Sequence, residues 1–85
     1  MAKKKTFRVV CTYAGFSSEL DRKLFSAAEK VLGGRGGFSD GSGCGLGERD
    51  HEWNNLSLSQ AEALEAAFKV LSLPVSVYHE REEAY

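Results

Sequence analysis

The chain has 85 residues, a formal net charge of −1 and two cysteines. This length predicts one small domain, and the 42% of hydrophobic residues supplies enough apolar side chains for a core, which excludes general disorder. The near-neutral charge argues against a general nucleic-acid binder, which needs an excess of lysine and arginine. Two cysteines are too few for a secreted disulfide scaffold, so we expect reduced thiols in a cytoplasmic protein.

No stretch of the sequence approaches the about 18 consecutive apolar residues that a membrane-spanning helix requires. No apolar segment follows the N-terminal lysines as it would in a signal peptide. We therefore expect no membrane association. The single domain is expected to span residues 1–85, with a basic tail at residues 1–5 and an acidic tail at residues 80–85.

Residues 6–13 are rich in β-branched and aromatic side chains, which predicts a first strand. Successive side chains of a strand point to opposite faces, so Phe7, Val9, Cys11 and Tyr13 share one face. This face is predicted to point into the core.

A helix is predicted next, with Ser17 or Ser18 as its N-cap. Gly33 is its predicted end, because the residue after a helix often adopts the left-handed conformation that glycine tolerates. Apolar residues between these points recur at helical spacing and predict one buried stripe. They are Leu20, Leu24, Phe25, Ala28, Val31 and Leu32.

A second helix is predicted within residues 57–74. Ser59 is its predicted N-cap, since Glu62 three residues later would complete a capping box. Pro74 is predicted to end it, because proline disfavours helical geometry in the residue before it. The predicted core-facing stripe consists of Ala61, Leu64, Ala67, Phe68 and Leu71.

The segment between the helices begins with glycine at every second position from Gly41 to Gly47. This spacing matches no phosphate-binding loop, and acidic residues follow it, so a structural role is predicted. Gly45 and Gly47 are the glycines expected to need positive φ or close backbone approach. A turn is predicted within residues 39–43 and a β-bulge near Gly47, which would let Trp53 face the core.

The strand that follows places Arg49, His51 and Trp53 on one face and Asp50 and Glu52 on the other. Neither face is apolar throughout. This pattern predicts a strand that is exposed on one side or lies at a sheet edge.

Residues 75–80 predict the last strand, with Val75 and Val77 facing the core and Ser76 and Tyr78 facing outward. The order of elements is therefore β-α-(one or two β)-α-β. It predicts an α+β two-layer sandwich, with two helices on one face of a three- to four-stranded, mostly antiparallel sheet. This order resembles the ferredoxin-like arrangement across the whole chain, which implies an architecture and no activity.

Neither an active site nor a metal site is predicted. The sequence contains no CxxC, HxxxH or HExxH spacing, so no metal or other cofactor is expected. His51 has Asp50 and Glu52 as neighbours, but in a strand these carboxylates point away from its imidazole. We therefore expect no enzymatic activity.

The predicted function is that of a small protein-interaction module. It would be an adaptor, or an inhibitor or regulator of a larger assembly of the kind that phages and mobile elements encode, with a protein partner of unknown identity. The predicted binding surface is the open sheet face or its edge. Its candidate residues are Arg8, Arg49, His51, Trp53 and Tyr78.

Two alternatives remain open at this point. A single-stranded nucleic-acid binder could use the same residues, because aromatic side chains beside arginines stack on bases. A small-molecule or metal-binding domain could form at the glycine-rich strand, with Cys44, His51 and His79 as ligands. Pairing of edge strands between two copies is a further hypothesis.

Overall fold

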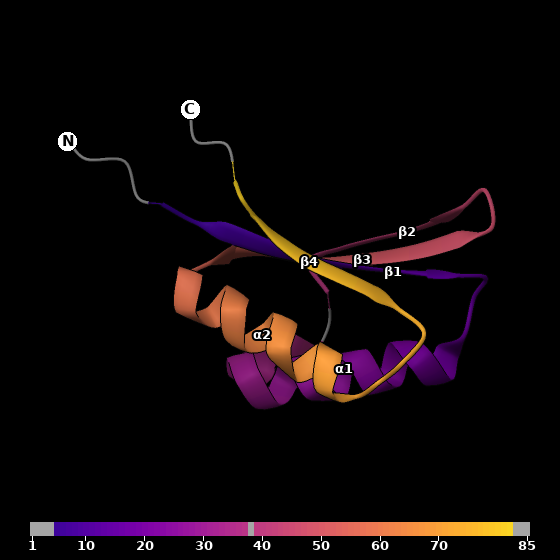
Figure 1. The fold of residues 1–85 in the computed structure, drawn as a ribbon, viewed down its shortest axis with the longest axis horizontal. Helices are drawn as coiled ribbons and strands as arrows, with labels where there is room; N and C mark the ends of the chain where they lie inside the picture. The colour runs from indigo at the N-terminus through magenta and orange to yellow at the C-terminus, as the bar shows by residue number, and fades with distance from the viewer. Residues whose placement is uncertain (1–4, 38, 83–85) are drawn as a thin grey trace.

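A computed structural model describes residues 5–37 and 39–82 as a two-layer α+β fold (Figure 1). Two helices pack on one side of a four-stranded antiparallel sheet, which confirms the predicted fold class and its ferredoxin-like order. The elements are β1 (Phe7–Ala14), α1 (Ser18–Leu32), the 3-10 helix η1 (Gly33–Gly37), β2 (Gly41–Gly45), β3 (Glu48–Leu56), α2 (Leu58–Val70) and β4 (Ser76–Arg81).

The strand order across the sheet is β2-β3-β1-β4. β1 lies inside the sheet and pairs with β3 on one side and β4 on the other. β3 is therefore an inner strand, and the edges are β2 and β4. Of the two alternatives predicted for β3, exposure on one side is confirmed and the edge position is not. Both helices lie on the same side of the sheet (Figure 1), and we call the opposite, uncovered side the open face.

The predicted core face of β1 is confirmed. Val9, Cys11 and Tyr13 are buried against the helices, and Phe7 packs partly buried beside them. Burial raises the pKa of the Cys11 thiol to about 12, so this cysteine behaves as a small apolar side chain.

The predicted ends of α1 are also confirmed. The Ser17 side chain accepts a hydrogen bond from the Leu20 backbone N–H, which makes Ser17 the N-cap. Gly33 follows the helix with a φ of 77°, a conformation that glycine adopts without steric cost. Leu24 and Ala28, from the predicted stripe, are fully buried.

The prediction for the start of α2 was wrong by two residues. Ser57, not Ser59, is the N-cap, and it forms the capping box with Gln60 instead of Glu62. Both serines fit the same sequence pattern. Because the buried Leu56 fixes the end of β3, the first serine beyond the sheet takes the N-cap.

The end of α2 was also predicted too late. The helix ends at Val70, and Ser72 then adopts a left-handed φ of 53°. Pro74 lies beyond this turn and leads into β4, so it does not itself end the helix.

The glycine-rich segment forms β2, and its turn lies later than predicted. β2 and β3 form a hairpin whose two connecting residues, Leu46 and Gly47, have φ values of 52° and 78°. Two positive φ values are those of a type I′ turn, which matches the twist of the paired strands. The turn predicted within residues 39–43 and the bulge predicted at Gly47 are therefore both corrected.

A register shift does occur in β3, but at its far end. Trp53 pairs with Val9, whereas Leu56 pairs with Phe7, so β3 has one extra residue there. Asn55 absorbs the irregularity with a φ of 60°. The shift allows both Trp53 and Leu56 to point into the core, where both are fully buried.

β4 extends through Glu80 and Arg81, the first two residues of the stretch predicted as an acidic tail. The backbone N–H of Glu82 donates to the carbonyl oxygen of Thr6 at 2.9 Å, which extends the pairing of β1 with β4 by one more hydrogen bond. The rest of the predicted tails, residues 1–4 and 83–85, lies outside the described residues.

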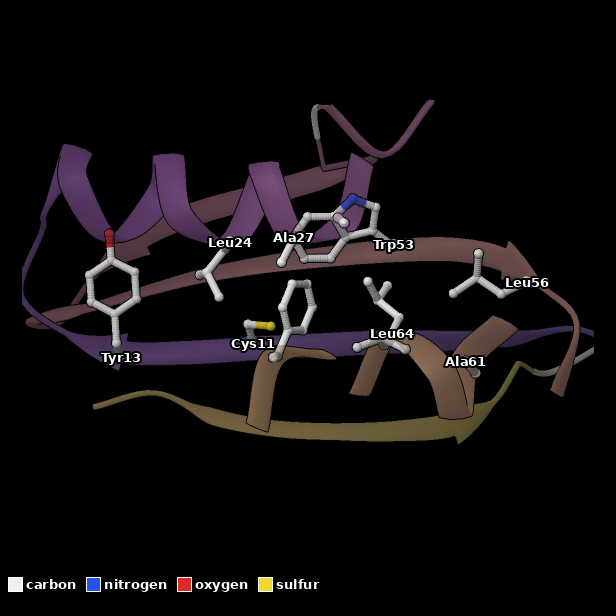
Figure 2. Close-up of a cluster of buried hydrophobic side chains, with 11 residues drawn as sticks. Cys11, Tyr13, Leu24, Ala27, Trp53, Leu56, Ala61 and Leu64 are labelled. Carbon is white, nitrogen blue, oxygen red and sulfur yellow. The ribbon is translucent and has the colours of Figure 1, made fainter. Parts of the chain in front are cut away.

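The core lies between the helices and the sheet (Figure 2). Trp53 and Phe68 are its largest fully buried side chains, and their ring centroids lie 5.2 Å apart. Both aromatic rings are fully buried, and aromatic pairs at this separation add stability beyond their buried area. The buried apolar residues are Val9, Cys11, Tyr13, Leu24, Ala27, Ala28, Trp53, Leu56, Ala61, Leu64 and Phe68.

Replacing Gly47 with alanine tests the hairpin turn. Gly47 has φ +78° and open space around its Cα, so the cost is purely conformational. We expect Gly47→Ala to lower the free energy of unfolding by roughly 1–2 kcal/mol in a denaturant titration. Gly45→Ala is the matched control, since Gly45 also has open space but lacks a positive φ. Equal effects of the two substitutions would contradict the turn.

Candidate functional site

The five residues predicted to form one binding surface lie on opposite sides of the sheet. Arg8 and Tyr78 lie on the open face, as predicted. Arg49, His51 and Trp53 point toward the helices instead, because their strand pairs in register with the core-facing residues of β1. His51 is 1% exposed and Trp53 is 0% exposed, so neither can contact a partner on the open face. The predicted surface is corrected accordingly.

A buried polar cluster explains why Arg49 and His51 face the helices. At its centre is Asp21, which projects from the first turns of α1 and is 7% exposed. The Tyr13 hydroxyl donates to Oδ1 of Asp21 at 2.6 Å, and Nε2 of His51 donates to the same atom at 2.7 Å. Nε and Nη2 of Arg49 donate to Oδ2 at 3.2 and 3.0 Å. We call these residues, with Ser39, the Asp21 cluster.

The Asp21 cluster also reaches the start of β2. An ionised carboxylate only accepts hydrogen bonds, so Nε2 of His51 carries a proton toward Asp21. In the neutral imidazole, Nδ1 then accepts from the Ser39 hydroxyl, whose Oγ lies 3.1 Å away. The cluster thereby connects α1, β1, β3 and Ser39, two residues before β2, through one chain of hydrogen bonds.

A serine, a histidine and an aspartate in this order can activate a hydroxyl for nucleophilic attack. Three features argue for a structural role here. Arg49 and Tyr13 also bind the Asp21 carboxylate and stabilise its charge, and the His51 side chain is fully enclosed. Third, Ser39 lines neither of the two hollows described below.

The charges of the cluster depend on one another. Burial alone would raise the pKa of Asp21, but the hydrogen bonds from Tyr13, His51 and Arg49 outweigh it and lower this pKa. Burial and the bond to Asp21 raise the pKa of Tyr13. The guanidinium of Arg49 also lies 5.0 Å from the centroid of the Phe16 ring, which covers it from outside.

A second polar contact, absent from the predictions, joins α2 to β4. Nδ1 of His79 is hydrogen-bonded to a carboxylate oxygen of Glu65, and the other oxygen accepts from Nζ of Lys69 at 2.6 Å. These bonds from Lys69 and His79 lower the pKa of Glu65. His79 thus points toward the helices and does not share a site with His51 or Cys44.

The open face is predominantly acidic. Asp50 and Glu52 on β3 and Glu80 on β4 share it with Arg8 on β1. Nη2 of Arg8 lies 3.2 Å from a carboxylate oxygen of Glu80, so its charge is already partnered. The carboxylates of Asp50 and Glu52 therefore set the sign of the electrostatic potential at the centre of this face.

A hollow of about 470 Å³ lies on the open face. Gly41 forms part of its wall, and Gly43 follows two residues later on β2. A Cβ atom at Gly41 would lie 2.7 Å from Oε1 of Glu52, and one at Gly43 would lie 2.9 Å from Oδ1 of Asp50. The missing side chains leave room for these carboxylates to extend over β2. The residues that line this hollow are Arg8, Val10, Gly41, Ser42, Asp50, His51, Glu52 and Tyr78, of which His51 has a fully buried side chain.

Within residues 5–37 and 39–82, no group of three or more His, Cys, Asp or Glu side chains could hold a metal ion. The ligands considered in the sequence do not converge: Cys44 is exposed, whereas His51 is enclosed in the Asp21 cluster. Neither helix in this part of the chain is long and apolar enough to cross a membrane.

Comparisons of this chain with protein-family models, with curated proteins and with solved structures gave no match.

Replacing Asp21 with asparagine tests the cluster. We expect the free energy of unfolding at pH 7 to fall by about 3 kcal/mol, because Arg49 and His51 lose their buried partner. The pKa of Asp21 is lower in the folded state, so its contribution is complete above its unfolded pKa, about 3.9, and is lost as the pH falls through the folded value. The variant should therefore lose less stability than the natural protein during acid titration.

Glu19→Gln is the matched control, since Glu19 lies in the same helical turn but is exposed. We expect it to change the free energy of unfolding by no more than about 0.5 kcal/mol. Stability curves of Asp21→Asn and the natural protein that run parallel between pH 7 and pH 2 would contradict the account of the cluster.

Proposed function

We propose that the protein is a non-enzymatic interaction module whose open face binds a lysine- and arginine-rich segment of a partner protein. The observation that carries this proposal is the acidic hollow on the uncovered side of the sheet. A sheet with one covered and one free face offers a rigid platform, since every strand beneath it is fixed by the core.

The positions of the two central carboxylates suggest the form of the ligand. Asp50 and Glu52 are separated by one residue on β3, so their Cα atoms lie about 7 Å apart. Side chains at positions i and i+2 of an extended peptide have the same separation. An extended segment with basic residues at alternate positions would place one cation near each carboxylate.

Neighbouring side chains supply the remaining contacts. Tyr78 is 48% exposed beside the hollow, and its ring can lie against a guanidinium or the methylene groups of a lysine. Val10 offers a partly buried apolar contact between Tyr78 and the carboxylates. Together these groups combine charge recognition with a limited apolar contact.

The same electrostatics favour a protein over a nucleic acid as the partner. Asp50, Glu52 and Glu80 would repel phosphates, and the Arg8 guanidinium is engaged by Glu80. Self-association through the outer edges of β2 or β4 stays a prediction.

The proposal is tested with a synthetic peptide of alternating lysine and valine and an isotope-labelled sample of the protein. We expect amide shifts to change at Asp50, Glu52 and Tyr78 on binding, and the affinity to fall as salt is added. Asp50→Lys should weaken binding about ten-fold or more, because it reverses a charge at the hollow.

The matched control is Glu62→Lys, which makes the same change of charge at an exposed position of α2, on the other layer. It should leave the affinity unchanged. An equal loss of affinity for the lysine–valine peptide in the two variants would contradict the proposal. Peptide-induced shifts confined to the helices would also contradict it, as would a glutamate–valine peptide that bound as tightly as the lysine–valine peptide.

A further inference from the structure

The outer surface of the helical layer holds a second concave region, a groove of about 780 Å³ between α1 and α2. We propose that it binds an amphipathic helix of a partner protein whose apolar side is flanked by aspartate or glutamate. This surface lies on the layer opposite to the open face, so the inference does not rest on the function proposed above.

The first observation is a second apolar stripe on α2. The core-facing residues Ala61, Leu64 and Phe68 account for one side of this helix. A separate stripe, Ala63, Ala66, Ala67 and Val70, recurs at the i, i+3, i+4, i+7 spacing of another helix face. Because the fully buried residues of α2 lie outside this stripe, the outer side of α2 is available for contact.

The second observation is the exposure of that stripe. Val70 is 80% exposed, and Ala63 and Ala66 are exposed as well. Ala27 and Val31 of α1 are apolar residues that line the groove from the other helix. The apolar floor of the groove is thus contiguous across the two helices.

The third observation is the charge along the groove. Arg22, Lys23 and Lys30 line it from α1, and Glu19 is the one acidic residue that lines it within residues 5–37 and 39–82. Nζ of Lys23 lies 3.2 Å from Oε1 of Glu19, in an exposed i,i+4 pair that contributes little stability. An incoming acidic side chain can therefore pair with this rim, whereas a basic one would be repelled.

A helix fits this groove better than an extended segment. The floor consists mainly of alanines, and small side chains let two helix axes approach to the short end of the usual range of about 8–10 Å. A third helix laid between α1 and α2 would bury its own apolar stripe against Val70 and the alanines. Its acidic flank would then lie along Arg22 and Lys30.

The test uses a labelled synthetic helix of about 18 residues, five turns long, with leucines on one side and glutamates on the other. We expect fluorescence anisotropy to report saturable binding, and a lysine version of the peptide to bind at least about ten-fold more weakly. Arg22→Glu should weaken binding about five-fold, and Val70→Glu about ten-fold. Both sites are exposed, so both variants are expected to fold.

Arg81→Glu is the matched control for charge, because Arg81 is exposed at the end of β4, away from the groove. It should not change the affinity. The inference is overturned by absence of binding, by equal binding of the lysine peptide, or by an unchanged affinity in Arg22→Glu and Val70→Glu. It is also overturned if sedimentation shows a dimer that Val70→Glu dissociates, since the groove would then hold a second copy of this chain.

The experiments distinguish a failure of helix binding in the groove from a failure of peptide binding on the open face. The lysine–valine peptide and Asp50→Lys report on the open face, whereas the leucine–glutamate helix and Arg22→Glu report on the groove. Either pair of results can be negative without affecting the other.

Discussion

The fold depends on the orientation of β3, and the Asp21 carboxylate fixes that orientation. A shift of one residue would turn every side chain of β3 to the other side of the sheet. Asp50 and Glu52 would then face Asp21 from below the helices, where three carboxylates would repel one another. Buried ion pairs contribute little net stability, but this one strongly favours the orientation in which Arg49 and His51 meet Asp21.

The acidic character of the open face follows from this orientation. Because Arg49 and His51 are enclosed, Asp50 and Glu52 remain on the open face, which becomes acidic. On the helical layer, the groove between α1 and α2 is lined by three basic residues and one acidic residue. Under the two binding proposals made above, one partner segment binds the acidic open face and another binds the basic-rimmed groove.

Hydrophobic periodicity was sufficient to predict β1, both helices, β4 and the two-layer class, because each of these elements has one clearly apolar side. Periodicity did not predict which side of β3 faces the core, because a buried side composed of Arg49, His51 and Trp53 resembles an exposed one. Asp21 did carry a signal: it lies one turn before Leu24, within the apolar stripe of α1. In the β2–β3 turn, Gly47 carried a signal and has the positive φ expected of it, but Leu46 carried none, since leucine is not a residue that indicates such a turn.

The fluorescence of the single tryptophan, Trp53, tests the orientation of β3 most directly. Its ring is fully buried beside Phe68, and its Nε1 lies 3.4 Å from the carbonyl oxygen of Gly36. We predict blue-shifted emission that iodide and acrylamide barely quench in the native protein, and a red shift with full quenching only on unfolding. Red-shifted, readily quenched emission from the folded protein would place Trp53 on the open face and contradict the account.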